Sequence, residues 1–132
     1  MCVGYTDLNK VHSKDNYQLP RIDQLVDSIV GHEVLSFLDV YNGYNQISIH
    51  RAVVEKMTFI TEQGTYCYKV MPFRLKNAIA IFQRLVTWVF ENLIRNQVEV
   101  YVDNLVEKNE GASQHPQNLF EVFFVLRHFN IN

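Results

Sequence analysis

Apolar residues recur at three- and four-residue steps in three separate stretches of the 132-residue chain. This spacing places them on one face of an α-helix, so it predicts helices over 21–30, 78–94 and 119–129. Gly31 follows the first helix at the position where a residue with a left-handed backbone commonly ends a helix. Ser113 precedes the last helix and is its predicted N-terminal cap.

Short runs of β-branched and aromatic residues separate these helices. They predict strands over 1–5, 33–38, 57–61, 65–71, 97–102 and 105–107. Residues 62–64 link two of these strands as a hairpin, Asp103 and Asn104 form a second two-residue turn, and the polar segment 6–20 is rich in turn-forming residues. Hairpins that alternate with helices predict an α+β domain, with an antiparallel sheet that carries its helices on one face.

Composition and charge narrow the class of protein. The chain is 48% hydrophobic and 20% charged, as is typical of a globular domain, and its length fits a single domain over residues 1–132. Twelve basic against fourteen acidic residues give a net charge of −2, so the whole chain lacks the basic excess of a nucleic-acid-binding domain. No apolar run has membrane-spanning length and no signal-peptide pattern is visible. We therefore expect an intracellular protein outside the membrane, whose compartment and oligomeric state the sequence leaves open.

Two acidic residues at the ends of predicted strands are the candidates for chemistry. Asp39 follows the strand 33–38 and Asp103 follows the strand 97–102, so their carboxylates converge if these strands are neighbours. Converging carboxylates hold two divalent cations in enzymes that transfer phosphoryl groups. Aspartate is also a common turn residue after a strand, and from the residues alone both interpretations stay open.

Three blocks of the sequence, taken in order, resemble the palm of a reverse transcriptase. They are FLDVYNGYNQI at 37–47, YCYKVMPFRLKNA at 66–78 and VYVDNL at 100–105. The flanking segments 8–23 and 117–131 are similar to those of gypsy-type long-terminal-repeat retrotransposons. The resemblance covers nearly the whole chain and implies a palm-like domain with partial fingers. It also implies an RNA-directed DNA polymerase, which adds deoxynucleotides to a primer on an RNA or DNA template with the help of Mg²⁺ or Mn²⁺.

The resemblance implies roles for individual residues. Asp39, the main-chain carbonyl of Val40 and Asp103 match the positions that bind the catalytic metal ions. Tyr44 matches the aromatic residue that lies against the sugar of the incoming nucleotide and selects deoxyribose over ribose; the alternative is an ordinary core tyrosine. The segment that borders the nucleotide pocket is matched by Phe73, Arg74 and Lys76.

Basic residues are locally in excess around the second block. Between residues 69 and 95, Lys69, Arg74, Lys76, Arg84 and Arg95 stand against Glu91 alone. Such a patch can steer phosphate groups in a chain of near-neutral total charge. For Arg84 and Arg95, a solvated helix face is an equally good interpretation.

The chain departs from the family pattern at three positions. Asn104 replaces the second aspartate of the Tyr-x-Asp-Asp hairpin, and an amide oxygen is a weaker metal ligand than a carboxylate. Arg74 replaces a glycine, which offers a permissive backbone or room for a substrate. Gly4 replaces an aspartate. Because complete fingers, a thumb and an RNase H segment are also missing, we expect a truncated, degenerate reverse transcriptase fragment with little or no activity. The alternative is a non-catalytic α+β binding module, or a relic without a biochemical role.

Overall fold

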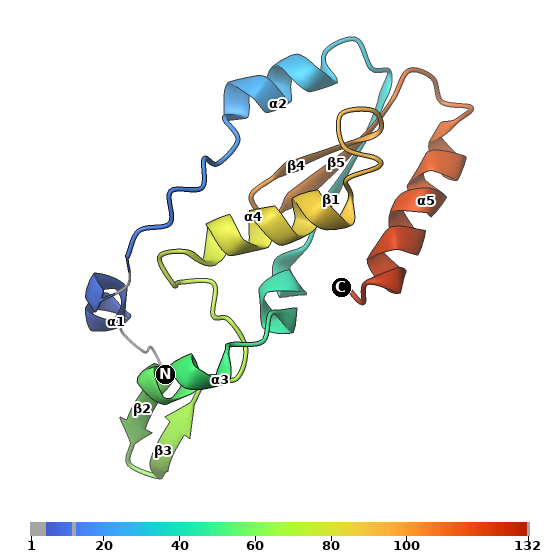
Figure 1. The fold of residues 1–132 in the computed structure, drawn as a ribbon. Coiled ribbons are helices and arrows are strands. Elements are labelled where there is room, and N and C mark those ends of the chain that lie inside the picture. The colour runs from blue at the N-terminus through green and yellow to red at the C-terminus, as the bar shows by residue number, and fades with distance from the viewer. Residues whose placement is uncertain (1–4, 12, 132) are drawn as a thin grey trace.

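The computed structural model describes residues 5–11 and 13–131, which form an α+β fold (Figure 1). Its helices are α1 (Thr6–Val11), α2 (Ile22–Ile29), α3 (Arg51–Val54), α4 (Ala78–Val89) and α5 (His115–His128), with the 3-10 helices η1 (Tyr41–Gln46) and η2 (Glu55–Met57). Its strands are β1 (Val34–Asp39), β2 (Thr58–Thr61), β3 (Gly64–Cys67), β4 (Val98–Tyr101) and β5 (Asn104–Asn109). The strand predicted over 1–5 falls almost entirely outside the described residues.

Strands β1, β5 and β4 form an antiparallel sheet in that order. β4 and β5 are joined as a hairpin, and β1 pairs with β5 from Val34 opposite Asn109 to Asp39 opposite Asn104. β2 and β3 form a separate two-stranded hairpin at the opposite end of the molecule (Figure 1). The predicted α+β class with antiparallel pairing is therefore confirmed.

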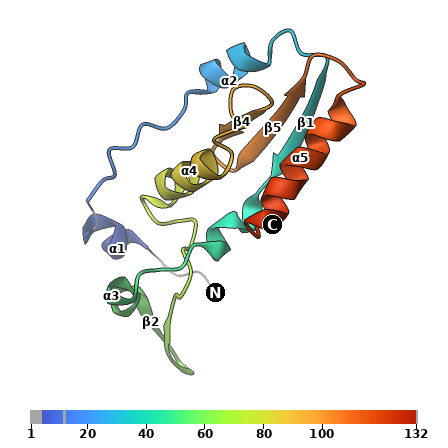
Figure 2. The same ribbon diagram turned by 45° about the vertical axis from the view of Figure 1, so that its right-hand side comes forward.

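Helices α4 and α5 pack on the same face of the three-stranded sheet (Figure 2). Their apolar stripes meet the sheet in one core, because every third or fourth residue of each helix faces inward. Burial of this apolar surface is the main term that stabilises the fold. The buried residues of the core include Phe82, Val86, Phe90, Val98, Val100, Leu105, Val122 and Leu126.

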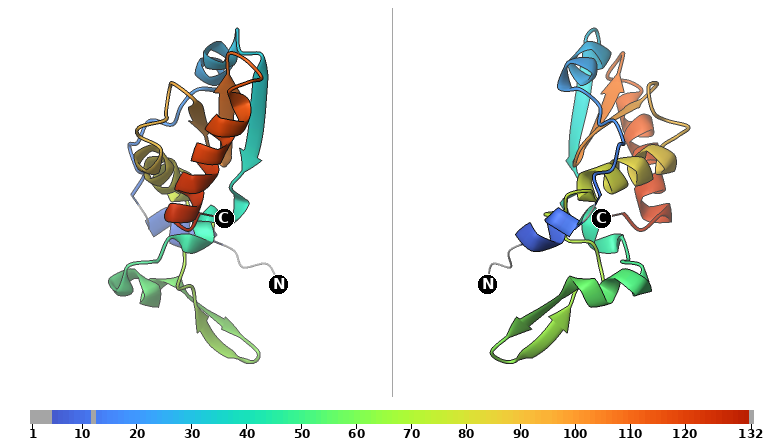
Figure 3. Two further views of the ribbon diagram at one scale, coloured as in Figure 1. Left: turned by 90° about the vertical axis from the view of Figure 1, so that its right-hand side faces the viewer. Right: turned by 60° about the vertical axis from the view of Figure 1, so that its left-hand side comes forward.

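The shorter helix α2 lies against the other face of the sheet, at the end distant from the β2–β3 hairpin (Figure 3). Lys108 points to that face, because it alternates with Glu107 along β5. Its ammonium group donates a hydrogen bond to the carbonyl of Ser28 in α2 at 3.1 Å and forms an ion pair with Glu99 at 2.8 Å. The predicted arrangement of helices on one face thus describes the two long helices, and α2 is added on the opposite side.

A cluster of polar side chains fixes the first turn of α5 to the sheet. The Nδ1 atom of His115 lies 3.0 Å from a carboxylate oxygen of Glu107, and its Nε2 atom lies 3.2 Å from the hydroxyl of Ser36. Asn109 donates a hydrogen bond to the other oxygen of Glu107 and accepts one from Asn118. Glu107 is fully buried. Buried polar groups require such partners, so the cluster orients α5 on the sheet.

Three predictions about the helices need correction. Helix α1 forms within 6–20, a segment predicted to consist of turns. Helix α4 ends at Val89 rather than 94, because the chain turns while Leu93 and Ile94 still pack against the core from outside the helix. Ser113 is not the cap of α5, which begins at His115 with Gln114 in the cap position.

Helix α2 and the strands of the β2–β3 hairpin agree more closely with the prediction. α2 ends where expected, and Gly31 has the predicted left-handed backbone, with a φ of +89°. The predicted strand 65–71 is shorter, since β3 ends at Cys67 and Val70 forms an isolated bridge with Ser48. Within residues 5–11 and 13–131, no helix is both long and apolar enough to cross a membrane.

Candidate active site

The turn between β4 and β5 consists of Val102 and Asp103, rather than of Asp103 and Asn104 as predicted. Tyr101 and Asn104 form the last pair of the hairpin, which places Asn104 inside β5. Val102 has a φ of +54°, a left-handed value that is unusual for a β-branched residue. Mirror-image hairpin turns need a positive φ at this position, and here a valine supplies it.

A glutamine from α4 holds this turn in place. The side-chain oxygen of Gln83 accepts a hydrogen bond from the Val102 amide at 2.9 Å, and its nitrogen donates one to the carbonyl of Val100 at 3.2 Å. Gln83 is only 3% exposed. Sequence reasoning missed this residue, although a polar side chain on the apolar stripe of a helix signals a buried group that needs partners.

Asp39 and Asp103 come together through β5. The strands that precede them, β1 and β4, are not neighbours, because β5 lies between them. The Val40 amide nevertheless donates a hydrogen bond to the Asp103 carbonyl at 2.9 Å, and Asp39 pairs with Asn104 across the sheet. The structure thus gathers Asp39, Val40, Asp103 and Asn104 at one end of the sheet.

Tyr44 joins this group from η1, which follows β1. Its hydroxyl donates a hydrogen bond to the Asp103 carboxylate, and its ring packs against Phe82 with 4.5 Å between centroids. Burial, and after it the hydrogen bond to Asp103, raise the pKa of the Tyr44 hydroxyl far above its ordinary value. Tyr44 is a buried core residue, and its hydroxyl occupies part of the hydrogen-bonding capacity of Asp103.

A glycine beside Tyr44 permits this close packing. A Cβ atom added at Gly43 would lie 2.7 Å from the Cζ atom of Phe82, which is closer than real Cβ contacts come. Gly43 is itself buried, so the ring of Phe82 fills the space that any side chain would need. The Asn-Gly pair that looks like a turn signal therefore serves the packing between η1 and α4.

Phe73, Arg74 and Lys76 lie in the exposed loop between β3 and α4. The guanidinium group of Arg74 lies 5.7 Å from the centre of the Phe73 ring. Asn9 of α1 donates a hydrogen bond to the carbonyl of Arg74 at 3.2 Å and accepts one from the Lys76 amide at 2.9 Å. Arg74 does not have a positive φ, so its backbone does not need the glycine that the family carries here.

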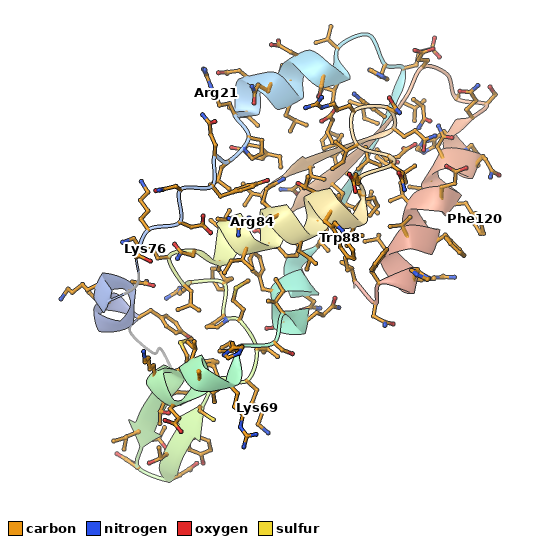
Figure 4. All side chains as sticks on the ribbon, in the orientation of Figure 1. Arg21, Lys69, Lys76, Arg84, Trp88 and Phe120 are labelled. Atoms are coloured by element: carbon orange, nitrogen blue, oxygen red, sulfur yellow. The ribbon has the colours of Figure 1, made fainter. Side chains whose placement is uncertain are left out.

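Arg84 is held by the N-terminal segment and does not belong to an open basic patch. Its guanidinium contacts both carboxylate oxygens of Asp15 at 2.9 Å and lies 4.8 Å from the centre of the Tyr17 ring. The Tyr17 amide, and with a smaller effect Arg84, hold the pKa of Asp15 below its usual value. Lys69 and Lys76 remain exposed on the surface (Figure 4).

The donor set at the end of the sheet is smaller than the one that two metal ions need. It offers the carboxylates of Asp39 and Asp103, the amide of Asn104 and the carbonyl of Val40. In the part of the chain that the structure describes, no three side chains of His, Cys, Asp or Glu are grouped so that they could hold a metal ion. Hard divalent cations favour carboxylate oxygens, so these residues do not fit a pair of metal ions.

Comparisons with known proteins agree with this architecture. The sequence profile of the family "Reverse transcriptase (RNA-dependent DNA polymerase)" matches residues 1–132. An "RNA-directed DNA polymerase homolog" of Oenothera berteroana is 38% identical over 106 residues, which cover 80% of this chain and 75% of that protein. The "Retrovirus-related Pol polyprotein from transposon 412" of Drosophila melanogaster is 31% identical over 131 residues, 99% of this chain. The chain spans only 11% of the length of that polyprotein.

Solved structures share the fold at lower sequence identity. The foamy viral protease-reverse transcriptase in complex with double-stranded DNA superposes with a TM-score of 0.84 at 23% identity, over 94% of this chain and 22% of that one. Prototype foamy virus protease-reverse transcriptase in its native form gives a TM-score of 0.83 at 24% identity, over 94% and 16% of the two chains. Because the family profile matches this chain from residue 1 to residue 132, the chain belongs to the reverse transcriptase family.

Proposed function

We propose that the chain keeps the nucleotidyl-transfer architecture of a reverse transcriptase palm but does not catalyse DNA synthesis. The observation that supports the proposal is the pairing of Asp39 with Asn104 at the end of the sheet. The family's third carboxylate would stand at position 104, beside the other two. An amide there removes one negative charge from a group of residues whose role is to gather two dications.

The remaining donors favour a single divalent cation over a pair, since two carboxylates carry too little charge for two dications. Asp39, Asp103 and the Val40 carbonyl, which stand at the same end of the sheet, would hold one Mg²⁺ or Mn²⁺ ion. Tyr44 donates a hydrogen bond from its hydroxyl to the Asp103 carboxylate, which leaves fewer free lone pairs on that carboxylate. One cation would neutralise the charge of the two carboxylates.

Nucleic acid is the partner that the fold favours. The structural relatives include the foamy viral protease-reverse transcriptase bound to double-stranded DNA and to an RNA/DNA hybrid. On this chain the exposed cations Lys69, Arg74 and Lys76 are free to meet phosphate groups, whereas Arg84 is engaged with Asp15. We therefore expect weak, salt-dependent binding to a primer-template and no stable deoxynucleotide complex.

Primer extension tests the loss of activity. The chain is incubated with an RNA template, a DNA primer, deoxynucleotides and either Mg²⁺ or Mn²⁺, beside an active reverse transcriptase as the positive control. We expect no extension above the level of an Asp39→Asn, Asp103→Asn double variant. Extension that the wild-type chain supports and this double variant does not would overturn the proposal.

Binding of Mn²⁺ tests the donor set itself, without any need for turnover. Calorimetric titration should show at most one weakly bound ion in the wild-type chain. Asn104→Asp restores the missing carboxylate and should tighten binding roughly tenfold, since affinity for hard cations follows the charge of the ligands. Asn92→Asp adds the same charge at an exposed position outside the site and is the matched control. Equal affinity in the wild-type chain and Asn104→Asp would show that these residues do not form the metal site.

A further inference from the structure

Three side chains outside the candidate active site, Ser36, His115 and Glu107, contact one another in a row. Ser36 of β1 and Glu107 of β5 are opposite each other in the sheet, so their side chains lie on the same face. The imidazole of His115, in the first turn of α5, bridges them. Its Nε2 atom is 3.2 Å from the Ser36 hydroxyl, and its Nδ1 atom is 3.0 Å from a Glu107 carboxylate oxygen. A hydroxyl, an imidazole and a carboxylate in this order are the groups that activate a serine as a nucleophile.

The burial of Glu107 indicates which imidazole nitrogen carries the proton. Glu107 is fully buried, and among the described residues its Oε2 atom accepts no hydrogen bond from any group other than Nδ1 of His115. Nδ1 also lies 2.9 Å from the side-chain nitrogen of Asn109, which already donates a hydrogen bond to Oε1 of Glu107. A carboxylate can only accept hydrogen bonds, so the proton belongs on Nδ1 of His115. The lone pair of Nε2 is then directed at the Ser36 hydroxyl, as a general base requires.

The hydroxyl and the imidazole can be reached from solvent, whereas the carboxylate cannot. Ser36 is half-buried, and the side chain of His115 is 23% exposed. Glu107 orients the imidazole from inside the fold, which is the position of the acidic residue in serine hydrolases. The same contacts also fix α5 to the sheet, and this structural role supports the chemical one because both need an imidazole that does not rotate.

The open edge of β1 supplies a donor for the oxygen that becomes negative during acyl transfer. β1 is an edge strand of its sheet (Figure 2). The Val40 amide donates to the Asp103 carbonyl, and amides of an antiparallel strand alternate between its two sides, so the Ser36 amide also points to β5. The Phe37 amide therefore points to the open edge. The amide of the residue after the nucleophile is an oxyanion donor in serine hydrolases of the α/β class.

From this geometry we infer that Ser36 is the nucleophile of a site that hydrolyses small carboxylic esters. The Ser36 oxygen bonds to the carbonyl carbon while its proton passes to Nε2 of His115. The bond from that carbon to the alcohol oxygen then breaks, and the alcohol leaves with this proton. Water attacks the acyl-serine and gives a proton to His115, which returns it to the Ser36 oxygen as the acid leaves. The Phe37 amide stabilises the carbonyl oxygen in both steps, and Glu107 is a positioning residue. The site is separate from the carboxylates at the turn between β4 and β5.

A fluorophosphonate probe tests the nucleophile directly, because an activated serine forms a stable bond to its phosphorus and releases fluoride. Mass spectrometry of the labelled full chain should find the probe on Ser36, and Ser36→Ala should not be labelled at any serine. Ser113→Ala replaces an exposed serine outside the row and should keep the label on Ser36. A wild-type chain whose Ser36 stays unlabelled after prolonged incubation would overturn the inference.

Hydrolysis of para-nitrophenyl acetate tests the base. His115→Gln keeps a polar side chain beside Ser36 but cannot take up its proton, so it should slow ester hydrolysis and probe labelling roughly a hundredfold. His128→Gln replaces an exposed histidine of the same helix and controls for catalysis by a surface imidazole. Circular dichroism checks that both variants are folded. Equal rates in these two variants would contradict the role of His115.

The positioning role of Glu107 has a spectroscopic readout. ¹⁵N NMR distinguishes a ring nitrogen that carries a proton from one that does not, and in the wild-type chain the neutral imidazole of His115 should carry its proton on Nδ1. Glu107→Gln should give a mixture of both tautomers and slow probe labelling at least roughly tenfold. A proton on Nε2 in the wild-type chain would rule out the activation of Ser36, whether or not Glu107→Gln folds.

Discussion

The side chain of Gln83 in α4 accepts a hydrogen bond from the amide of Val102, the residue with a left-handed backbone in the turn that carries Asp103. This contact links the core helix to the end of the sheet that carries Asp39 and Asp103. A valine at positive φ is unfavourable unless its surroundings hold it there. We infer that Gln83 positions Asp103 through the backbone of the turn.

Replacing this glutamine should destabilise the chain and loosen the turn. Gln83→Leu keeps the size of the side chain but leaves the Val102 amide and the Val100 carbonyl without their partner, which costs about 2 kcal/mol of unfolding free energy. Urea denaturation measures the loss, and amide hydrogen exchange at Val102 should become faster.

Two further variants separate the roles of this side chain. Gln83→Glu retains an oxygen that can accept from the Val102 amide and should fall between the wild-type chain and Gln83→Leu. Gln117→Leu makes the same replacement at an exposed position of α5 and should change stability by less than about 0.5 kcal/mol. A Gln83→Leu variant as stable as Gln117→Leu would show that the turn does not depend on this contact.

Tyr44 should make the chain sensitive to alkaline pH. The pKa of its hydroxyl is raised in the folded state, so the folded chain holds this proton at a pH where the unfolded chain, with a pKa near 10, has released it. The stability that Tyr44 contributes is thus fully present below about pH 10 and falls as the pH rises further. Tyr44→Phe removes the titrating group and should flatten this fall.

Unfolding free energies measured between about pH 8 and about pH 11, on either side of the ordinary tyrosine pKa, report the effect. The pKa of Tyr5 is also raised, first by burial and then by its hydrogen bond to Tyr68, so part of the pH dependence should persist in Tyr44→Phe. Tyr101→Phe is the control, because it removes a tyrosine hydroxyl near the same turn. If Tyr44→Phe and the wild-type chain lose stability in parallel above pH 10, the Tyr44 proton is not held by the fold.

The sequence predicts those elements of the fold that are determined by residues close together in the chain. β1 and the β4–β5 hairpin follow from runs of apolar residues, and the stripe from Ala78 predicts α4. Helix α1 was missed because Thr6–Val11 is short and polar, and its Asn9 finds its partners more than sixty residues away in the loop with Arg74. A contact of that kind leaves no trace in local spacing.

The candidate site shows the same limit. The sequence predicts that Asp39 and Asp103 converge if their strands are neighbours. The strands are not neighbours, and β5 between them brings the backbones of the two residues to the same end of the sheet. The predicted turn, Asp103–Asn104, lies one residue after the observed one, because Asp-Asn is a favourable pair of turn residues. The register that pairs Tyr101 with Asn104 depends instead on long-range contacts. The prediction that these residues bind metal ions remains a prediction.

Asn9 should control how often the loop with Arg74 and Lys76 opens. Asn9→Ala removes two hydrogen bonds, to the Arg74 carbonyl and from the Lys76 amide. At about 1 kcal/mol for each bond, the open state should become more than roughly tenfold more populated. Trypsin cleaves after Arg74 and Lys76, so the initial rate of cleavage at these sites, read by mass spectrometry, should rise by that factor. Asn92→Ala, at an exposed turn, should leave the rate unchanged, and a rise that both variants share would contradict a specific role for Asn9.

Gly43 should be essential for the packing that brings Tyr44 to Asp103. A methyl group at this position would overlap the ring of Phe82, whose Cζ atom lies 2.7 Å from the position of the added carbon. Overpacking of this kind in a core typically costs 1–3 kcal/mol, so Gly43→Ala should lower the unfolding free energy by about 2 kcal/mol. Gly111→Ala is the matched control, because nothing lies within 4 Å of a Cβ atom there and its φ is not in the left-handed region.

The ring of Phe82 also supports Tyr44, so Gly43→Ala should bring the alkaline loss of stability closer to that of Tyr44→Phe. Gly43→Ala and Gly111→Ala of equal stability would mean that Phe82 has room to move, and that the contact between η1 and α4 is looser than the distances indicate.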